Sequence, residues 1–164
     1  MVMPAGNPYM RGDAPVANGF DRVEMCARAL EDLPEYLQEK VVLTDLEVRR
    51  EGPTYAIDTL NALKPFFPKD TFTLILGSDA AANFDSWHKA AELKKLVEIL
   101  VVKRPGVVAS SSSNKSHYPE IEIDALDISA TAVRQVLASG QDASPYISDS
   151  VLDYIKERGL YGCK

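Results

Sequence analysis

The order of apolar runs and amphipathic stretches along the chain predicts an α/β fold, with a mostly parallel sheet, helices on both of its faces and right-handed crossovers between strands. Two short runs that are almost entirely apolar, at 72–76 and 99–102, are typical of strands buried within a parallel sheet. Stretches with apolar residues at helical spacing separate and follow these runs. The chain has 164 residues, enough to bury the core of one domain, so we predict a single domain over 1–164.

The first half of the chain predicts two helices and two strands. Apolar residues at helical spacing mark both helices, and Pro34 and Pro53 stand where one helix must stop and the other can begin. β-Branched residues mark the first strand, and a continuous apolar run ending at Gly77 predicts that the second is buried on both faces. The expected elements are a helix over 19–33, a strand over 39–50, a helix over 52–68 and a strand over 70–79.

The second half continues the alternation. After the second strand, Phe84, Trp87 and Ala91 are spaced to share one helical face. The last two helices carry apolar faces and end near Gly140 and Gly159, since glycine suits the left-handed turn that follows a helix. The expected elements are a helical region over 78–96, a buried strand within 98–106, an exposed serine-rich loop over 107–120, a half-exposed strand over 120–126, and helices within 125–140 and 146–161.

Composition excludes several classes of protein. A net charge of −6 without a lysine block makes a poor general binder of nucleic acids or membrane surfaces, so we expect neither partner, and any anion site must be local. The two cysteines, Cys26 and Cys163, have no metal-ligand spacing, which argues against a zinc site and a disulfide framework. No apolar run is long enough to cross a bilayer and no signal sequence is found, so a cytoplasmic protein is expected.

A candidate anion site lies at the predicted carboxyl ends of three strands, where ligands bind in open α/β sheets. The stretches that follow these strands are 77–79, 103–106 and 127–134, and we expect them to be neighbours. Ser129 and Thr131 at a helix start can simply cap it, but free N–H groups, two hydroxyls and the Arg134 guanidinium together also suit a phosphate. Arg104 would add a second guanidinium, whose paired N–H donors suit a polyphosphate, although a surface salt bridge is an equally good role for Arg104.

Three further side chains have both a structural and a functional interpretation. Asp79 can accept ribose hydroxyls or cap the next helix. Trp87 is the only tryptophan; it can belong to the core or offer a flat surface for a heterocycle, together with its neighbour His88. No pattern of Ser, His and Asp marks a nucleophile with an activating base.

Several motifs appear in a familiar order: "GPTYAIDTL", "LILGSDAAANFDSWHKAAEL", "VVKRPG", "ISATAVR" and "VLDYIKERGLY". From about Met3 to Tyr161 the chain resembles bacterial nicotinate-nucleotide adenylyltransferases, members of the nucleotidyltransferase superfamily. The resemblance implies a Rossmann-like nucleotidyltransferase fold. It also implies transfer of AMP from ATP, with Mg²⁺, to nicotinate mononucleotide, giving nicotinic acid adenine dinucleotide and pyrophosphate in NAD synthesis. Because the substrate's own phosphate is the nucleophile, the protein has to position two polyanions and stabilise charge.

The resemblance also assigns roles to individual residues. One set of residues would bind the phosphates and the ribose of ATP. In nicotinate mononucleotide, Trp87 would stack on the pyridine ring, and backbone N–H groups would bind the carboxylate. Carboxylate recognition by such donors is a physical route to preferring nicotinate over nicotinamide. The ATP-binding set is Ser129, Thr131, Arg134, Asp79, Gly77 and Arg104, and the substrate-binding set is Thr54, Tyr55, Ala56, Trp87, His88 and Arg11.

The resemblance has one large gap. Family members begin with a strand and a GxFDPxHxGH turn that contacts the phosphates, and this sequence opens near what would be the second strand. The expectation is therefore a fold without its first strand–helix unit and with no catalytic residue of its own from that turn. Little or no adenylyltransferase activity, and a stability below that of the complete enzyme, would follow. A non-catalytic nucleotide-binding module and a related adenylyl- or cytidylyltransferase for another phosphate ester remain alternatives, and the sequence predicts no oligomeric state.

Overall fold

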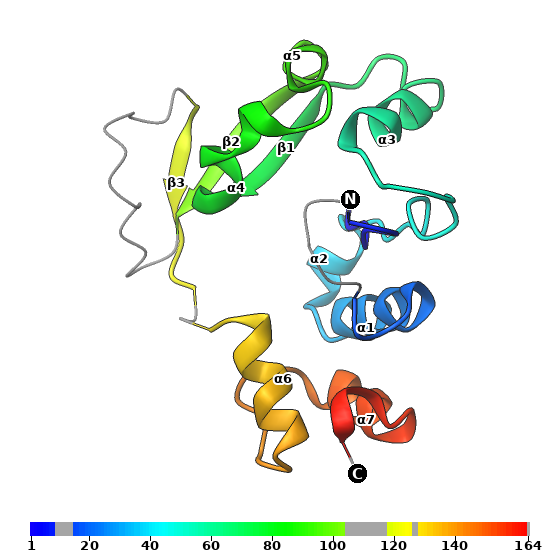
Figure 1. Cartoon of the computed structure of the whole chain (residues 1–164), viewed down its shortest axis with the longest axis vertical. Helices are drawn as coiled ribbons and strands as arrows, with labels where there is room; N and C mark the ends of the chain where they lie inside the picture. Colours follow the sequence, from blue (N-terminus) through cyan, green and yellow to red (C-terminus); the bar gives the residue numbers. More distant parts are fainter. Residues whose placement is uncertain (9–14, 104–117, 126–127, 164) are drawn as a thin grey trace. The chain divides into compact units, whose positions relative to one another are not determined.

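We analysed a computed structural model of the chain, which describes residues 1–8, 15–103, 118–125 and 128–163 (Figure 1). The chain divides into two compact units. One, here called unit 1, is built from Met1–Thr54 and Ile128–Lys164, and the other, unit 2, from Tyr55–Asp127. Each unit is described by itself, and the single domain over 1–164 stays a prediction.

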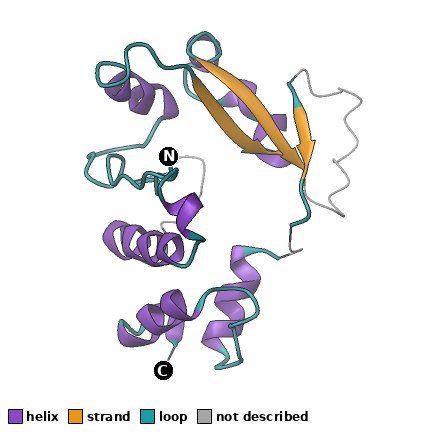
Figure 2. Cartoon of the chain, turned by 180° about the vertical axis from the view of Figure 1, so that it is seen from behind, coloured by secondary structure: helices purple, strands orange, loops and turns teal. Residues whose placement is uncertain are grey.

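Unit 2 contains a three-stranded parallel sheet, in the order β1-β2-β3, from strands β1 (Phe72–Gly77), β2 (Val97–Lys103) and β3 (Glu120–Glu122). The register pairs Leu76 with Val101. Four short helices accompany the strands (Figure 2): α3 (Ala56–Leu63), α4 (Ser78–Ala82), η1 (Phe84–Ser86) and α5 (Ala90–Leu93). Parallel strands linked through helices confirm the predicted α/β class.

The core of unit 2 is formed by Ile57, Leu76, Phe84, Leu93, Ile99 and Val101. Successive side chains of a strand point to opposite faces, so Leu74 and Leu76 pack with this core while Ile75 does not. Ile75 is 65% exposed, and the expectation that this strand is buried on both faces was therefore wrong. An apolar run shows that a strand is apolar, but it does not show that both faces are covered.

The predicted helical region over 78–96 is broken into three short pieces. Trp87 has an extended backbone after η1, and Lys89 is left-handed with φ 53°, so no continuous helix can pass through them. Phe84 is buried and Trp87 half-buried against it, with ring centroids 5.2 Å apart, but Ala91 is exposed. Ala91 therefore does not share the predicted apolar face; Ala90 and Leu93 are buried instead.

Unit 1 contains helices α1 (Gly19–Glu31), α2 (Glu35–Gln38), α6 (Ala130–Ala138) and α7 (Asp149–Glu157), with the short η2 (Leu160–Gly162). Its core consists of Leu137, Ala143, Val151, Leu152 and Ile155, with Met25 of α1 packed against it. The predicted helix ends hold: Gly140 and Gly159 have φ of 71° and 60°, a conformation that costs glycine little.

The strand expected over 39–50 was wrong. Only Leu43 pairs, in an isolated parallel bridge to Val2, and residues 46–49 form a turn. In that turn the Arg49 N–H donates to the Asp45 carbonyl at 3.0 Å, and the two side chains form an ion pair at 2.6 Å. This local pairing favours a helical turn over the extended backbone that β-branched residues predict.

Two other expectations concern the serine-rich loop and membrane-spanning segments. Most of the serine-rich loop lies outside the described residues, so its exposure stays a prediction. Within the described part of the chain, every helix is too short or too polar to span a membrane.

Candidate functional site

The N-terminus of α6, in unit 1, brings together three residues of the predicted ATP set. Ser129 is the N-cap, and its Oγ accepts a hydrogen bond from the Ala132 N–H at 3.1 Å, which confirms the capping interpretation. Arg134 lies one turn into the helix and donates through Nη2 to Thr131 Oγ1 at 3.1 Å. The hydroxyl hydrogen of Ser129 and the remaining Arg134 donors are chemically suited to phosphate oxygens.

The carboxyl end of β1, in unit 2, carries the other described members of that set. Gly77 is the N-cap of α4, and a Cβ added there would meet nothing within 4 Å. Asp79 is exposed in the first turn, where its negative charge suits the helix dipole. Its side chain makes no capping hydrogen bond, so the interpretation of Asp79 as the helix cap was wrong. The carboxylate therefore stays exposed at the end of a strand.

Aromatic rings from two separate segments of unit 2 meet near the start of α3. Tyr55, the N-cap residue of α3, stacks on His88 with ring centroids 4.1 Å apart and an interplanar angle of 26°. His88 is exposed and follows the half-buried Trp87. Ala56 is the first residue of the helix, and no side chain caps it. The first N–H groups of a helix have no partner inside the helix, so this end offers donors beside a pair of stacked rings.

Thr54, also predicted to bind the substrate, is 7% exposed, and its hydroxyl and N–H groups form hydrogen bonds within the protein. Its Oγ1 accepts a hydrogen bond from the Asn7 N–H at 2.9 Å, and its own N–H donates to the Asn7 carbonyl at 2.9 Å. Arg11 and Arg104, the remaining predicted site residues, lie outside the described residues. The structure thus groups Tyr55, Ala56, Trp87 and His88 in unit 2, and Ser129, Thr131 and Arg134 in unit 1.

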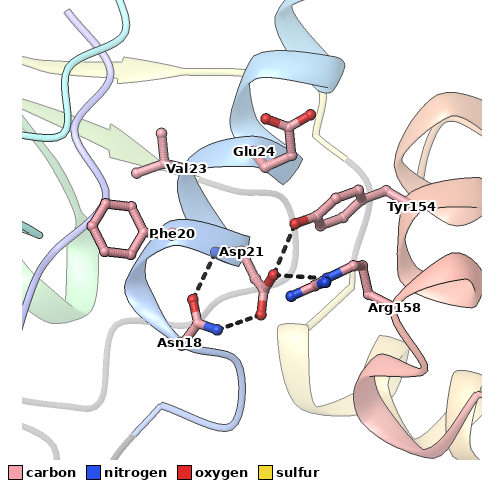
Figure 3. Close-up of a pocket in the computed structure, with 7 residues that line it drawn as sticks. All are labelled: Asn18, Phe20, Asp21, Val23, Glu24, Tyr154 and Arg158. Atoms are coloured by element: carbon pink, nitrogen blue, oxygen red, sulfur yellow. Dashed lines mark hydrogen bonds and ion pairs between the residues drawn. The ribbon is translucent and has the colours of Figure 1, made fainter.

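A buried carboxylate that the sequence patterns do not reveal, Asp21, lies between α1 and α7. Asp21 is 4% exposed and accepts hydrogen bonds from Asn18 Nδ2 at 2.6 Å and from the Tyr154 hydroxyl at 2.8 Å, with Arg158 Nε at 3.4 Å (Figure 3). Burial, and then the hydrogen bond to Asp21, raise the pKa of Tyr154. A cavity of about 580 Å³ beside this cluster is lined by Asn18, Phe20, Asp21, Val23, Glu24, Tyr154 and Arg158. No spacing rule links residues so distant in sequence.

Arg22 was missed for the same reason. Its guanidinium, in α1, donates to three backbone carbonyls: those of Ala5, Gly6 at 3.1 Å and Ala17 at 3.3 Å. Its position on a helix, three residues before the hydrophobic Met25, gave no sign of this role. Only a structure that folds the N-terminal segment against α1 reveals it.

Side chains that ligate metal ions are spread through the described part of the chain. Among residues 1–8, 15–103, 118–125 and 128–163, no three His, Cys, Asp or Glu side chains are grouped so as to hold a metal ion.

Comparisons with known proteins agree with the fold and the motifs. Residues 1–136 match the family described as cytidylyltransferase-like. The chain is 32% identical to a probable nicotinate-nucleotide adenylyltransferase of Dehalococcoides mccartyi over 98% of its own length and 81% of that protein. It is also 32% identical to the nicotinate-nucleotide adenylyltransferase of Bacillus subtilis strain 168, over 97% of this chain and 80% of that protein.

Solved structures share the fold. The nicotinic acid mononucleotide adenylyltransferase of Plasmodium falciparum complexed with NaAD superposes with a TM-score of 0.76 at 24% identity, over 94% of this chain and 79% of that one. The same enzyme complexed with APC gives a TM-score of 0.74. The parallel sheet with its helices is thus a Rossmann-like nucleotidyltransferase fold. Given 32% identity over nearly its whole length and a family match over residues 1–136, the chain belongs to the nicotinate-nucleotide adenylyltransferases, within the cytidylyltransferase-like family.

Proposed function

We propose that this chain binds ATP and nicotinate mononucleotide and transfers AMP between them in NAD biosynthesis, giving nicotinic acid adenine dinucleotide and pyrophosphate. The observation that carries the proposal is the similarity, over almost the whole chain, to proteins named for this activity. The grouping of phosphate-type donors at α6 and of rings and helix N–H groups at α3 supports it. We also propose a cytoplasmic location, in keeping with two free cysteines.

In this reaction the protein has to position the two substrates and stabilise the negative charge on their phosphates. A phosphate oxygen of nicotinate mononucleotide attacks the α-phosphorus of ATP, the bond to the bridging oxygen breaks, and pyrophosphate leaves with that electron pair. Ser129, Thr131, Arg134 and the α6 N-terminus hold phosphate oxygens and offset the charge that develops on them. Mg²⁺ enters bound to ATP, as part of the substrate, and neutralises phosphate charge.

The remaining assignments follow the chemistry of each group. Asp79, two residues after Gly77, accepts ribose hydroxyls of ATP, and Arg104 supplies a further guanidinium for its phosphates. Trp87 stacks on the pyridine ring, and the N–H groups near Tyr55, Ala56 and His88 receive its carboxylate. A carboxylate gains more than a neutral amide from such donors. Arg11 completes the substrate set on the basis of its position in the sequence.

Binding and turnover by the 164-residue chain test the proposal. Calorimetric titrations would measure dissociation constants for ATP and for three phosphate esters: nicotinate mononucleotide, nicotinamide mononucleotide and pantetheine phosphate. We expect ATP to bind and nicotinate mononucleotide to bind at least about tenfold more tightly than its amide, because a carboxylate accepts stronger hydrogen bonds from the backbone N–H groups than a neutral amide does. Equal binding of the esters, or a preference for pantetheine phosphate, would contradict the substrate assignment.

An assay of pyrophosphate release separates an enzyme from a binding module. We expect release that requires both ATP and nicotinate mononucleotide. Saturable binding of both ligands with no release at all would favour a module without chemistry.

A further inference from the structure

We propose that Arg22 is a positioning residue for the nicotinate-binding segment at the start of α3, and that it acts through Gly6, Asn7 and Thr54. The inference rests on the proposed function and deepens it. It also gives Thr54, a predicted ligand-binding residue, a different role. The groups involved up to Thr54 all belong to unit 1, and Thr54 is bonded directly to Tyr55.

The first step is the contact of α1 with the N-terminal segment. The Arg22 guanidinium donates from Nη1 to the Ala5 carbonyl and from Nη2 to the Gly6 carbonyl. Its Nε donates to the Ala17 carbonyl, one residue before the α1 N-cap. One planar cation thus fixes two consecutive peptide carbonyls against the start of a helix. Lysine cannot reproduce this geometry, because its ammonium is a single point rather than a rigid fork.

A second contact holds the same segment. A Cβ added at Gly6 would lie 2.0 Å from the Glu47 carbonyl oxygen and 3.0 Å from Thr54 Oγ1. Gly6 is therefore packed tightly against the turn at Glu47, in addition to the hydrogen bond that its carbonyl accepts from Arg22. A segment held by both contacts has little freedom to shift.

The second step is the contact between Asn7, which follows Gly6, and Thr54. Asn7 exchanges two hydrogen bonds with Thr54, one to its hydroxyl and one from its N–H, both 2.9 Å. Thr54 is 7% exposed, so its hydroxyl faces the protein and its acceptor is used by Asn7. The side chain consequently fixes its own peptide unit in place. It does not need to touch a ligand to affect binding.

The third step is covalent. Tyr55 follows Thr54 as the N-cap of α3, and Ala56 begins the helix whose first N–H groups the proposed function gives to the nicotinate carboxylate. Hydrogen bonds to a carboxylate depend steeply on distance and angle. A shift of Thr54 would therefore weaken recognition of the nicotinate nucleotide, whereas the α6 phosphate site contains none of these groups.

The only tryptophan provides the readout. Quenching of Trp87 fluorescence on titration with nicotinate mononucleotide gives its dissociation constant, and calorimetry with ATP gives the other. We expect Arg22→Lys to weaken nicotinate mononucleotide binding by about tenfold or more, in line with the sensitivity of binding to small displacements. ATP binding is expected to change by less than about twofold, because the phosphate contacts are made elsewhere.

The matched control is Arg28→Lys, on the same helix. Arg28 pairs with the Glu24 side chain at 3.1 Å and forms no hydrogen bond with a carbonyl of residues 1–8. It should leave both affinities unchanged. If Arg22→Lys alters neither affinity, lowers both equally, or behaves like Arg28→Lys, the inference is overturned while the proposed function stands. If the unaltered chain binds ATP but not nicotinate mononucleotide, the proposed function fails and this inference with it.

A second pair of variants keeps the test valid if Arg22→Lys does not fold, as judged by circular dichroism. Thr54→Val keeps the shape of the side chain but removes the acceptor for the Asn7 N–H, and Thr54→Ser restores it. We expect selective loss of nicotinate mononucleotide binding in Thr54→Val and recovery in Thr54→Ser. Equal binding by the two variants would show that the hydroxyl does not position the segment.

Discussion

Gly6 shows how a single atom can decide stability at the residue scale. Because an added Cβ would come within 2.0 Å of a backbone carbonyl, Gly6→Ala forces the N-terminal segment or the Glu47 turn to move. We expect a loss of about 1–3 kcal/mol in the free energy of unfolding, typical of overpacking. Urea titration followed by circular dichroism measures it. Gly77→Ala is the control, since its φ is −69° and nothing lies within 4 Å; an equal loss there would contradict the argument.

The hydrogen bond between Tyr154 and the buried Asp21 makes the stability of the folded chain depend on pH in the alkaline range. Burial and the hydrogen bond to Asp21 raise the pKa of Tyr154, so the folded chain keeps this proton after the unfolded chain has released it. The stabilisation is therefore complete below about pH 10, the ordinary value for tyrosine, and declines as pH rises further. Burial raises the pKa of Tyr161 as well, so it adds to the same decline.

Tyr154→Phe tests this interpretation. Removing the hydroxyl leaves the carboxylate of Asp21 one donor short, at a cost of about 1–3 kcal/mol near neutral pH. The decline above pH 10 should become shallower without disappearing, because Tyr161 remains. Denaturant titrations at pH 7 and in steps above pH 10 give both quantities. An unchanged slope would mean that Tyr154 does not carry the alkaline dependence.

At the scale of elements, α6 separates capping from ligand binding. Ser129→Ala removes the hydrogen bond to the Ala132 N–H, so we expect a loss of about 0.5–2 kcal/mol in stability. Arg134→Ala breaks only the bond to Thr131 near the helix surface, so stability should change little while ATP affinity falls at least about tenfold. Denaturation and calorimetry measure the two effects. Unchanged ATP affinity in Arg134→Ala would leave α6 as an ordinary capped helix.

Elements that are determined by local sequence patterns could be predicted, and elements that depend on distant contacts or unusual backbone angles could not. Helices α1, α3, α6 and α7 could be predicted because their apolar spacing and end residues are local. The break at Lys89 could not, because nothing in its chemistry favours a left-handed backbone. The same holds for the strand at 39–50, whose β-branched residues fit a sheet but find only Val2 as a partner.

The candidate site divides in the same way. The cap at Ser129 and its neighbour Arg134 could be predicted, since hydroxyls and a guanidinium within one helical turn are visible in the sequence. The stacking of Tyr55 on His88 and the contact of Asn7 with Thr54 could not, because each depends on how distant segments pack. Resemblance supplied the roles, and packing alone showed that the Thr54 hydroxyl is already bonded.

For the whole molecule, ATP should leave a distinct pattern of hydrogen exchange. The proposed ATP groups come from both units: Ser129, Thr131 and Arg134 from unit 1, and Gly77 and Asp79 from unit 2. A ligand held at about one hundred times its dissociation constant adds about 2.7 kcal/mol of stability. We therefore expect slower exchange at the start of α6 and also at the start of α4. Protection confined to α6 would restrict ATP to its phosphate groups.

The division of unit 1 into two stretches of sequence also determines the order in which the protein can assemble during synthesis. The hydrogen bond from Tyr154 to Asp21 joins residues 133 positions apart, so α1 leaves the ribosome long before α7 exists. Unit 2 is one continuous stretch whose strands pair in the order of their translation, and it can form as it emerges. Helix α1 is thus made before the helix that carries Tyr154, and a nascent chain exposes the side of α1 that contacts α7 until α7 has been released.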